Sequence, residues 1–269
     1  MNVSKRSRGA LILSDDRIVK TVDKALRLLK YFETNDCLGL TELARRSGYS
    51  KATTYRLLCT LEKHGFLKRT LDFNDTRYRL GLRLLELGNL VKERLELRRV
   101  ALPQMVRLRD RVGDSVQLVV RDELDGIYIE VVESKNPVRL YIRPGRRAPL
   151  YAGASTRLLL AYLPEEEIDR ILQICPPRAH TPNTITDVAV LKKVLAKVKE
   201  RGFALSKGEL AINSAELAVP LFDSEGQVVA ALSLAGSDHN YHGTQLREFL
   251  TAIKDTARII SKALGYRGD

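Results

Sequence analysis

The segment SGYSKATTYRLLCTLEKHGFL, residues 47–67, combines a polar turn with a helix that carries two kinds of side chain. At 100° per residue, one face of this helix gathers four side chains that are expected to pack inward: Thr54, Leu57, Leu58 and Leu61. The rest of the helix carries hydroxyl, methyl and cationic groups, and no Asp or Glu stands between Ser50 and Leu61. Because a solvated face usually mixes both signs of charge, this pattern favours contact with a polyanion over a plain surface helix.

These exposed groups suit the recognition of DNA. Lysine and arginine can reach guanine acceptors or phosphates, and alanine and threonine methyl groups can contact thymine. Ser50 is predicted to cap the helix, which runs from Lys51 to about His64 and ends at Gly65. In a helix-turn-helix, the N-terminal part of the second helix meets base edges in the major groove. We therefore expect a DNA interface at Ser50, Lys51, Ala52, Thr53, Tyr55 and Arg56.

Two predicted helices precede this segment and must position it. The first covers Val19–Glu33, where five apolar residues recur at steps of three and four: Val22, Ala25, Leu26, Leu29 and Phe32. The second covers Leu40–Gly48, with Thr41 as its N-cap and Gly48 as the turn that ends it. Thr41 is also expected at the DNA interface. A short helix, a turn containing glycine and a longer helix follow one another as in a helix-turn-helix.

Two strands are predicted after the third helix, at Phe66–Leu71 and Arg77–Leu80, joined by the turn DFNDT. Side chains alternate between the faces of a strand, so Arg77 and Arg79 are expected to project away from Tyr78. Such a wing suits phosphate contacts, which set affinity and register without reading sequence. The expected phosphate contacts are Arg69, Arg77 and Arg79.

The net charge of +12 is concentrated at the N-terminal end of the chain. Residues 1–80 carry 17 Lys and Arg against 9 Asp and Glu, whereas residues 101–269 carry 23 against 21. A basic first third joined to a nearly neutral remainder indicates that only the first part meets a polyanion.

A leucine-rich helix is predicted over Leu82–Val100, and Pro103 is expected to open the next helix. The apolar band of this linker is wider than packing against one domain requires, which indicates a second copy of the chain as its partner. A dimer also matches the paired half-sites of a pseudo-palindromic operator.

Helices and strands alternate in the remainder of the chain. Strand pairs joined by tight turns, such as RDELDG and DSEG, predict an antiparallel sheet with helices packed on it, and hence an α+β fold. No G-x-S-x-G, P-loop, G-x-G-x-x-G or H-E-x-x-H motif occurs. Ser155 in GAST could be a nucleophile, but no histidine partner is evident. A helix N-cap or a ligand-binding turn is the preferred interpretation, and a carboxylate bound by the helix start at Ala154–Thr156 would need no catalysis.

The composition excludes several other classes of protein. No apolar run approaches the roughly 18 residues of a membrane span, and the apolar stretch near the N-terminus is too short for a secretory signal, so we expect a cytoplasmic protein without a membrane partner. The three cysteines lack zinc-site spacing. The stretch SDHNYH could form a metal corner, but a polar loop before a helix explains it without a metal, and no cofactor is expected.

Nearly the whole chain resembles an IclR-type transcriptional regulator. The resemblance is carried by the final helix and by five stretches: VKTVDKALRLLKYF, LTELARRSGYSKATTYRLLCTLEKHGFL, RYRLGLRLLELG, RLLLAYL and RGFALSKGELAINSAELAVPLFDSEGQVVAALSLAG. The resemblance implies a homodimer, with a dimer of dimers as an alternative, and a GAF-like sheet domain that binds a small metabolite. The implied organisation is a flexible basic arm (1–16), a winged helix-turn-helix domain (17–81), a linker and dimerisation helix (82–99) and an effector-binding domain (100–269).

The resemblance also implies where the effector binds: Ala154, Ser155, Ser206, Lys207, Ser214, Glu216 and Ser233. The sequence departs from the family's pattern at Thr156-Arg157, where Gly-Lys is usual, and at Asn213, where glycine is common. Glu216 stands where a neutral residue is frequent. A carboxylate there would repel an anionic ligand, unless Lys207 or an arginine neutralises it, and would favour hydroxyl or amino groups.

Three functions follow from these observations. The first is a sequence-specific transcriptional regulator, acting as a repressor or an activator, whose DNA binding responds to a metabolite such as an organic acid or an aromatic compound. The second makes the C-terminal domain an assembly module without a ligand. The third makes it an enzyme. An enclosed polar pocket near Ser155, Ser214 and Ser233 would count against the second.

Overall fold

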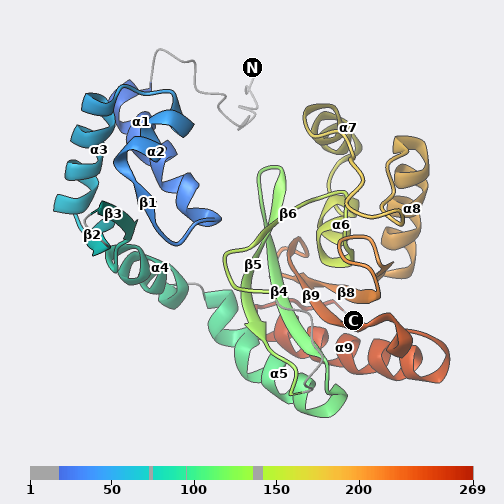
Figure 1. Ribbon diagram of the computed structural model, residues 1–269. Coiled ribbons are helices and arrows are strands. Elements are labelled where there is room, and N and C mark those ends of the chain that lie inside the picture. The colour runs from blue at the N-terminus through green and yellow to red at the C-terminus, as the bar shows by residue number, and fades with distance from the viewer. Residues whose placement is uncertain (1–17, 73–74, 95, 136–141, 269) are drawn as a thin grey trace, which may run out of the picture. The chain divides into compact units, whose positions relative to one another are not determined.

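The computed structural model describes residues 18–72, 75–94, 96–135 and 142–268 (Figure 1). The chain forms two compact units, of which one ends at Val91 and the other begins at Lys92. The predicted basic arm, residues 1–16, lies outside the described residues.

The N-terminal unit is a three-helix core with a small antiparallel sheet. Its elements are α1 (Lys20–Lys30), a 3-10 turn (Tyr31–Glu33), β1 (Leu38–Gly39), α2 (Leu40–Ser47), α3 (Lys51–Lys63), β2 (Leu67–Asp72) and β3 (Asp75–Leu80). The strand order is β1-β3-β2. The core joins Leu28 and Phe32 to Leu43, Leu58 and the buried ring of Tyr78. The helix-turn-helix and the wing predicted from the sequence are thus present.

Helix α1 packs with only part of the predicted stripe. Leu28 is fully buried, whereas Val22 and Leu26 of the predicted stripe are each 54% exposed. Phe32 of the predicted stripe is buried, and Ala25 and Leu29 pack against the same core, so one side of α1 enters the core and the side of Val22 and Leu26 does not. The other side therefore leaves apolar surface uncovered within this unit.

Helix α2 begins one residue before its predicted cap. Gly39 occupies the N-cap position with extended dihedral angles, and no side chain caps this helix. Thr41 lies within the first turn instead, so the expected Thr41 cap is wrong. The reason is that β1 runs directly into the helix at Leu40. Gly48 does end α2, in the left-handed conformation with φ of 72°.

The first wing strand is shifted by one residue from its prediction, and the second is longer than predicted. Strand β3 starts at Asp75 rather than Arg77, and the tip of the predicted turn, residues 73–74, lies outside the described residues. Leu67 pairs with Leu80 and Arg69 with Tyr78 across the ribbon. Leu80 is exposed even though Tyr78 is buried, so only part of the expected apolar face is covered.

Two helices connect the wing to the second sheet: α4 (Arg83–Arg94) and α5 (Glu96–Val112). The sequence predicted a single linker helix followed by a helix opening at Pro103. Pro103 instead lies inside α5, and the predicted boundary between residues 99 and 100 falls within that helix. Pro103 is exposed, and because it has no N–H it removes one i→i−4 hydrogen bond from α5.

The C-terminal unit is built on a six-stranded antiparallel sheet with the order β6-β5-β4-β9-β8-β7. The strands are β4 (Ser115–Asp122), β5 (Asp125–Val132), β6 (Arg147–Pro149), β7 (Ala204–Lys207), β8 (Ser214–Phe222) and β9 (Val228–Ser237). Four helices follow among them: α6 (Ala154–Ala161), α7 (Glu165–Ile174), α8 (Val188–Arg201) and α9 (Gly243–Ala263). The α+β fold predicted from the sequence is confirmed.

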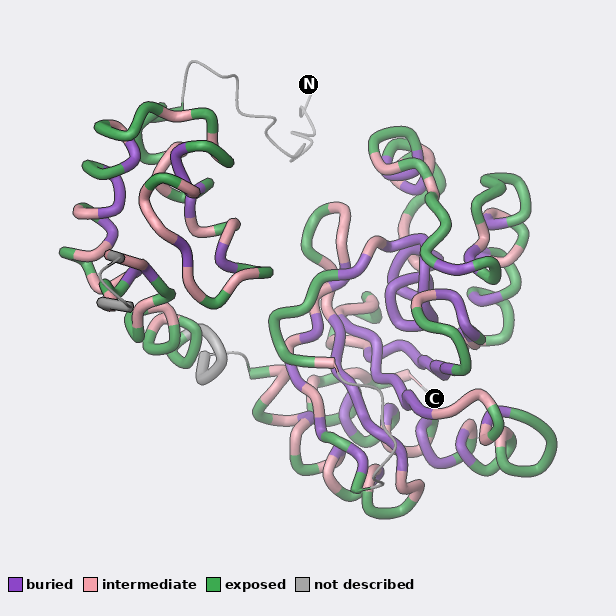
Figure 2. The backbone as a smooth tube through the Cα atoms, viewed as in Figure 1, coloured by how far each residue is buried: buried purple, intermediate pink, exposed green. Residues whose placement is uncertain are grey.

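Each face of this sheet has its own hydrophobic core. Leu118, Leu217 and Leu232 face α5 and α9, whereas Val119 and Ala218 face α6. In Figure 1, α6 and α8 lie on one side of the sheet, and α5 and α9 on the other. Every residue of α6 is buried, and Figure 2 shows it as a continuous buried segment. Within the described residues, none of the helices combines the length and apolar character that a membrane crossing requires.

Candidate nucleic-acid interface and ligand cavity

Helix α3 divides its side chains as its sequence pattern predicts. All four predicted core residues are buried: Thr54, Leu57, Leu58 and Leu61. The side chains of Lys51, Ala52, Tyr55 and Arg56 are exposed on the other side. Within the described part of the chain, neither Lys51 nor Arg56 forms an ion pair, so both cations are available to a partner.

Ser50 and Thr53 hold the start of α3. The Thr53 backbone N–H donates to Ser50 Oγ at 3.2 Å, and Ser50 Oγ donates to Thr53 Oγ1 at 2.9 Å. The predicted Ser50 cap is confirmed. Since both hydroxyls serve this capping, the structure separates Ser50 and Thr53 from the four freely exposed residues of the helix.

The wing arginines occupy different environments. Arg69 donates to Glu62 Oε2 at 2.8 Å, and its guanidinium lies over the Tyr78 ring. This ion pair holds Arg69 against α3. On the opposite face of the ribbon, Lys68 lies directly across from Arg79, and both are exposed. Sequence reasoning missed Lys68, although strand alternation places it on the outward face once the register is known.

A groove joins the start of α2 to the wing. Its lining includes Thr41, Arg45 and Arg77. Thr41 and Arg45 are exposed on the helix that precedes α3, and Arg77 pairs with Gly39 across the sheet. The first helix of a helix-turn-helix crosses the phosphate backbone, so this groove adds Arg45 to the predicted interface.

The C-terminal unit contains a cavity of about 230 Å³ on the α6 side of the sheet. Its lining consists of Gln117, Tyr128, Ile142, Arg146, Gly153, Ser206, Leu210, Ala211, Ser214, Ala215, Glu216 and Ala235. Ser206 of β7 lies directly across from Glu216 of β8. A smaller apolar cavity of about 150 Å³ is known to hold benzene, so the space suits a small organic molecule.

Some residues predicted to bind an effector surround this cavity. Ser206, Ser214 and Glu216 line it, and the Ala154 backbone N–H donates to Glu216 Oε2 at 2.7 Å. Ser233 lies behind the lining, where its hydroxyl donates to Gln117 Oε1 at 3.3 Å. Five of the predicted effector residues therefore lie at or directly behind the cavity wall: Ala154, Ser206, Ser214, Glu216 and Ser233.

Two other predicted effector residues do not line the cavity. Lys207 is exposed and pairs with Ala215, so its side chain leaves the sheet on the face opposite that of Ser206. Ser155 is fully buried within α6, where its hydroxyl interacts with that of the cavity-lining Tyr128. Sequence reasoning missed Gln117, Tyr128 and Arg146, which reach the cavity from the other half of the sheet.

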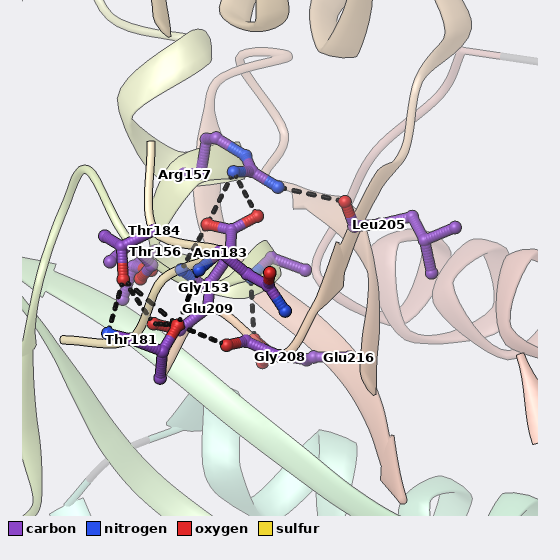
Figure 3. Close-up of polar contacts among 12 residues, drawn as sticks. Gly153, Thr156, Arg157, Thr181, Asn183, Thr184, Leu205, Gly208, Glu209 and Glu216 are labelled. Atoms are coloured by element: carbon purple, nitrogen blue, oxygen red, sulfur yellow. Dashed lines mark hydrogen bonds and ion pairs between the residues drawn. The ribbon is translucent and has the colours of Figure 1, made fainter. Parts of the chain in front are cut away.

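A buried ion pair fixes α6 beside the cavity (Figure 3). Arg157 Nη1 lies 2.7 Å from both carboxylate oxygens of Glu209, and Arg157 Nη2 donates to the Leu205 carbonyl oxygen at 2.9 Å. Thr181 and Thr184 donate to the carbonyl oxygens of Gly208 and Glu209 from the other side. The only sequence signal for this pair was an arginine within the otherwise apolar run RLLLA.

Tyr128 contributes a neutral phenol to the cavity. Burial raises the pKa of the Tyr128 hydroxyl well above its ordinary value, and the negative charge of Glu216 adds to this effect. The phenol therefore stays protonated throughout the physiological range and can donate a hydrogen bond.

Among the described residues, no group of three or more His, Cys, Asp or Glu side chains is arranged to hold a metal ion.

Comparisons with known proteins match both units. Residues 21–71 match the IclR helix-turn-helix domain, and residues 90–262 match the bacterial transcriptional regulator IclR C-terminal domain. The chain is 38% identical over 247 residues to the HTH-type transcriptional regulator KipR of Bacillus subtilis, covering 92% of this chain and 98% of that protein. It is 33% identical over 250 residues to the HTH-type transcriptional regulator XynR of Escherichia coli, covering 93% and 98%.

Solved structures agree with these matches. The crystal structure of the Thermotoga maritima IclR protein is 33% identical, with a TM-score of 0.74 over 93% of this chain and 100% of that one. An IclR homologue from Microbacterium hydrocarbonoxydans, complexed with 4-hydroxybenzoate, is 28% identical, with a TM-score of 0.79 over 91% and 98%.

Proposed function

Because the chain belongs to the IclR family of bacterial transcriptional regulators, we propose that a small metabolite held in the C-terminal cavity controls its binding to DNA. The family resemblance drawn from the sequence is confirmed by the matches to both domain models. The protein is a DNA-binding transcriptional regulator with a C-terminal effector domain, and its relatives are named for this non-enzymatic function. The observation that carries the proposal is a cavity lined by Gln117 and Glu216, each with a buried polar atom that has no partner among the described residues. The same chain presents the exposed cations Lys51 and Arg56 on α3.

In this proposal, α3 enters the major groove. Lys51, Ala52, Tyr55 and Arg56 would meet base edges or phosphates, while Ser50 and Thr53 hold the helix start. Thr41, Arg45, Lys68, Arg77 and Arg79 would meet the phosphate backbone. Arg69 contributes less, because its guanidinium is already paired with Glu62.

The proposed functional form is a homodimer on a pseudo-palindromic operator, with a dimer of dimers as an alternative. Exposed leucines on and beside α4 support it: Leu82 is 73% exposed and Leu85 is 61% exposed. The uncovered side of α1 adds Val22 and Leu26. Apolar surface of this kind in a DNA-binding unit favours a second copy of the chain. Since the DNA partner lies in the bacterial cytoplasm, we propose that location for the regulator.

The alternative functions fit less well. An assembly module without a ligand would fill the space beside Glu216 with side chains, whereas a cavity lies there. An enzyme acting through Ser155 would need a base beside its hydroxyl, whereas the group that interacts with it is the Tyr128 phenol, whose pKa burial raises.

A thermal-shift screen of small metabolites on the full chain tests the proposal. A ligand that binds the cavity is expected to raise the melting temperature and to change DNA affinity by about 5- to 150-fold. Ser206→Leu, which fills the cavity, should abolish both responses. Lys207→Ala is the matched control, because this neighbouring side chain leaves the opposite face of the sheet. A ligand that acts equally on the Ser206→Leu protein would contradict the cavity as the effector site.

The outward face of the wing gives a second prediction. Lys68→Ala should weaken binding to specific and random DNA by the same factor and reduce the slope of log affinity against log salt by about 1, as expected for one lost phosphate contact. Arg69→Ala should have a smaller effect on both. Fluorescence anisotropy across a salt series measures these slopes, and the reverse ranking of the two variants would disprove this assignment of the wing.

A further inference from the structure

The N-terminal end of α6 is already occupied by carboxylates of this chain. Glu216 Oε2 accepts the Ala154 N–H at 2.7 Å, and Glu209 Oε2 accepts the Gly153 N–H at 3.4 Å. A helix N-terminus attracts negative groups because its first N–H groups lack partners within the helix and its dipole is positive there. A carboxylate ligand would seek the same N–H groups, so the protein itself fills the position that such a ligand would take.

The cavity retains two unpaired polar atoms of complementary kinds. Glu216 is 9% exposed, and its Oε1 atom has no hydrogen-bond partner among the described residues. Gln117 is fully buried, and its Nε2 atom likewise lacks a partner there. Both residues line the cavity. The Ser233 hydroxyl donates to Gln117 Oε1, which leaves the amide nitrogen for the cavity.

Among the described residues, no cationic side chain pairs with Glu216 from within the cavity. The guanidinium of Arg157 is paired with Glu209, and Lys207 is exposed on the other face of the sheet. Arg146 lines the cavity and its charge acts on the Tyr128 hydroxyl, but the side chain is exposed, so solvent weakens its attraction for an anion. A second carboxylate brought beside Glu216 would therefore meet a like charge that already holds the helix start.

We propose that this cavity selects a small ligand without negative charge, one that donates a hydrogen bond from a hydroxyl or amino group to Glu216 Oε1 and accepts one from Gln117 Nε2, and that Glu216 excludes carboxylates. A single hydroxyl group can do both. The apolar lining, which includes Leu210 and Ala235, contacts the carbon skeleton. This assignment rests on the proposed function and narrows its effector, since an organic acid no longer fits at the start of α6.

Glu216→Ala tests the exclusion directly. Removing the side chain frees the Ala154 N–H and the space beside it, so small carboxylates should gain a site. With acetate, pyruvate, benzoate and 4-hydroxybenzoate as probes at ~10 mM, we expect the wild-type melting temperature to stay unchanged and that of the variant to rise by about 2 °C or more with at least one probe. Equal responses of the two full-length proteins, whether both respond or neither does, would overturn the assignment.

Two further variants keep the test decisive. Glu216→Gln retains an oxygen that can accept the Ala154 N–H, so it should remain unresponsive to carboxylates although its charge is gone. Glu216→Ser shortens the side chain while keeping a polar group, and it replaces Glu216→Ala if circular dichroism shows that the alanine variant is unfolded. Carboxylate binding by Glu216→Gln as strong as by the shortened variants would overturn occupancy of the helix start as the cause.

The metabolite identified in the thermal-shift screen tests whether Glu216 also contributes to binding the effector. Its affinity should fall at least tenfold on Glu216→Ala, because the acceptor of its donor group is lost. If the wild-type effector proves to be a carboxylate that changes DNA binding, the proposed function stands and only the ligand class is overturned. If no metabolite changes DNA binding, the proposed function itself fails.

Discussion

Replacing Arg157 with leucine is expected to destabilise the C-terminal unit by about 3–5 kcal/mol, because it leaves the Glu209 carboxylate buried without a cation. The side chains of this pair are 2% and 7% exposed. The leucine also removes the donor to the Leu205 carbonyl oxygen, which ties α6 to β7. Removing one partner of a buried pair costs more than removing both, since the remaining charge keeps its desolvation penalty.

Urea denaturation followed by circular dichroism measures this loss. Arg170→Leu on the exposed face of α7 is the matched control, and it should change stability by no more than about 0.5 kcal/mol. The double variant Arg157→Leu/Glu209→Leu should recover part of the loss. If Arg157→Leu unfolds like the Arg170 control, the pair does not stabilise the cavity wall as described.

The affinity for DNA should fall by roughly 10³ or more between 50 and 200 mM salt if six or more phosphates are neutralised. Each N-terminal unit presents at least four exposed cations that no described residue pairs: Lys51, Arg56, Lys68 and Arg79. Two copies on an operator would double that number. Salt weakens such binding because each phosphate contact releases condensed counterions.

Fluorescence anisotropy with labelled duplex DNA gives the slope of log affinity against log salt. Lys68→Ala/Arg79→Ala should reduce that slope by about 2 per chain, one for each lost phosphate contact. A slope near zero for the wild type would show that these cations do not neutralise DNA phosphates, whatever the affinity at one salt concentration.

The recognition helix was predictable because its signals are local. The cap at Ser50, the apolar face of Leu57, Leu58 and Leu61, and the turn at Gly65 all lie within one helix length of each other. Such short-range signals do not depend on how distant segments pack. The same holds for the alternation that predicted the wing strands.

The predictions that proved wrong concern features that depend on packing between segments distant in the sequence. Leu28 rather than Val22 enters the core, because α1 has apolar residues on two sides and only its partners select one. Pro103 was interpreted as a helix start, although it lies at an exposed position inside α5. Thr41 lost its predicted role as a cap because β1 pairs with β3 and continues directly into α2.

The cavity residues likewise differ in whether the sequence could identify them. Ser206, Ser214 and Glu216 could be assigned from the family resemblance, whereas Gln117 and Tyr128 come from strands far away in the sequence. Their approach depends on the register of β4 against β9 and of β4 against β5, which no local pattern fixes. The position of Lys207 follows from alternation along β7, since one step along the strand moves a side chain to the other face.

The central claim is that α3 reads the sequence of the operator, and Arg56→Ala tests it most directly. On a DNA site selected from a random library by the full chain, the variant should lose about 10- to 100-fold in affinity, corresponding to about 1–3 kcal/mol for one base contact. On random DNA it should lose much less, and Lys63→Ala near the end of the same helix should bind both like the wild type. Equal losses on the selected site and on random DNA would show that Arg56 contacts phosphate, and would contradict base reading by this residue.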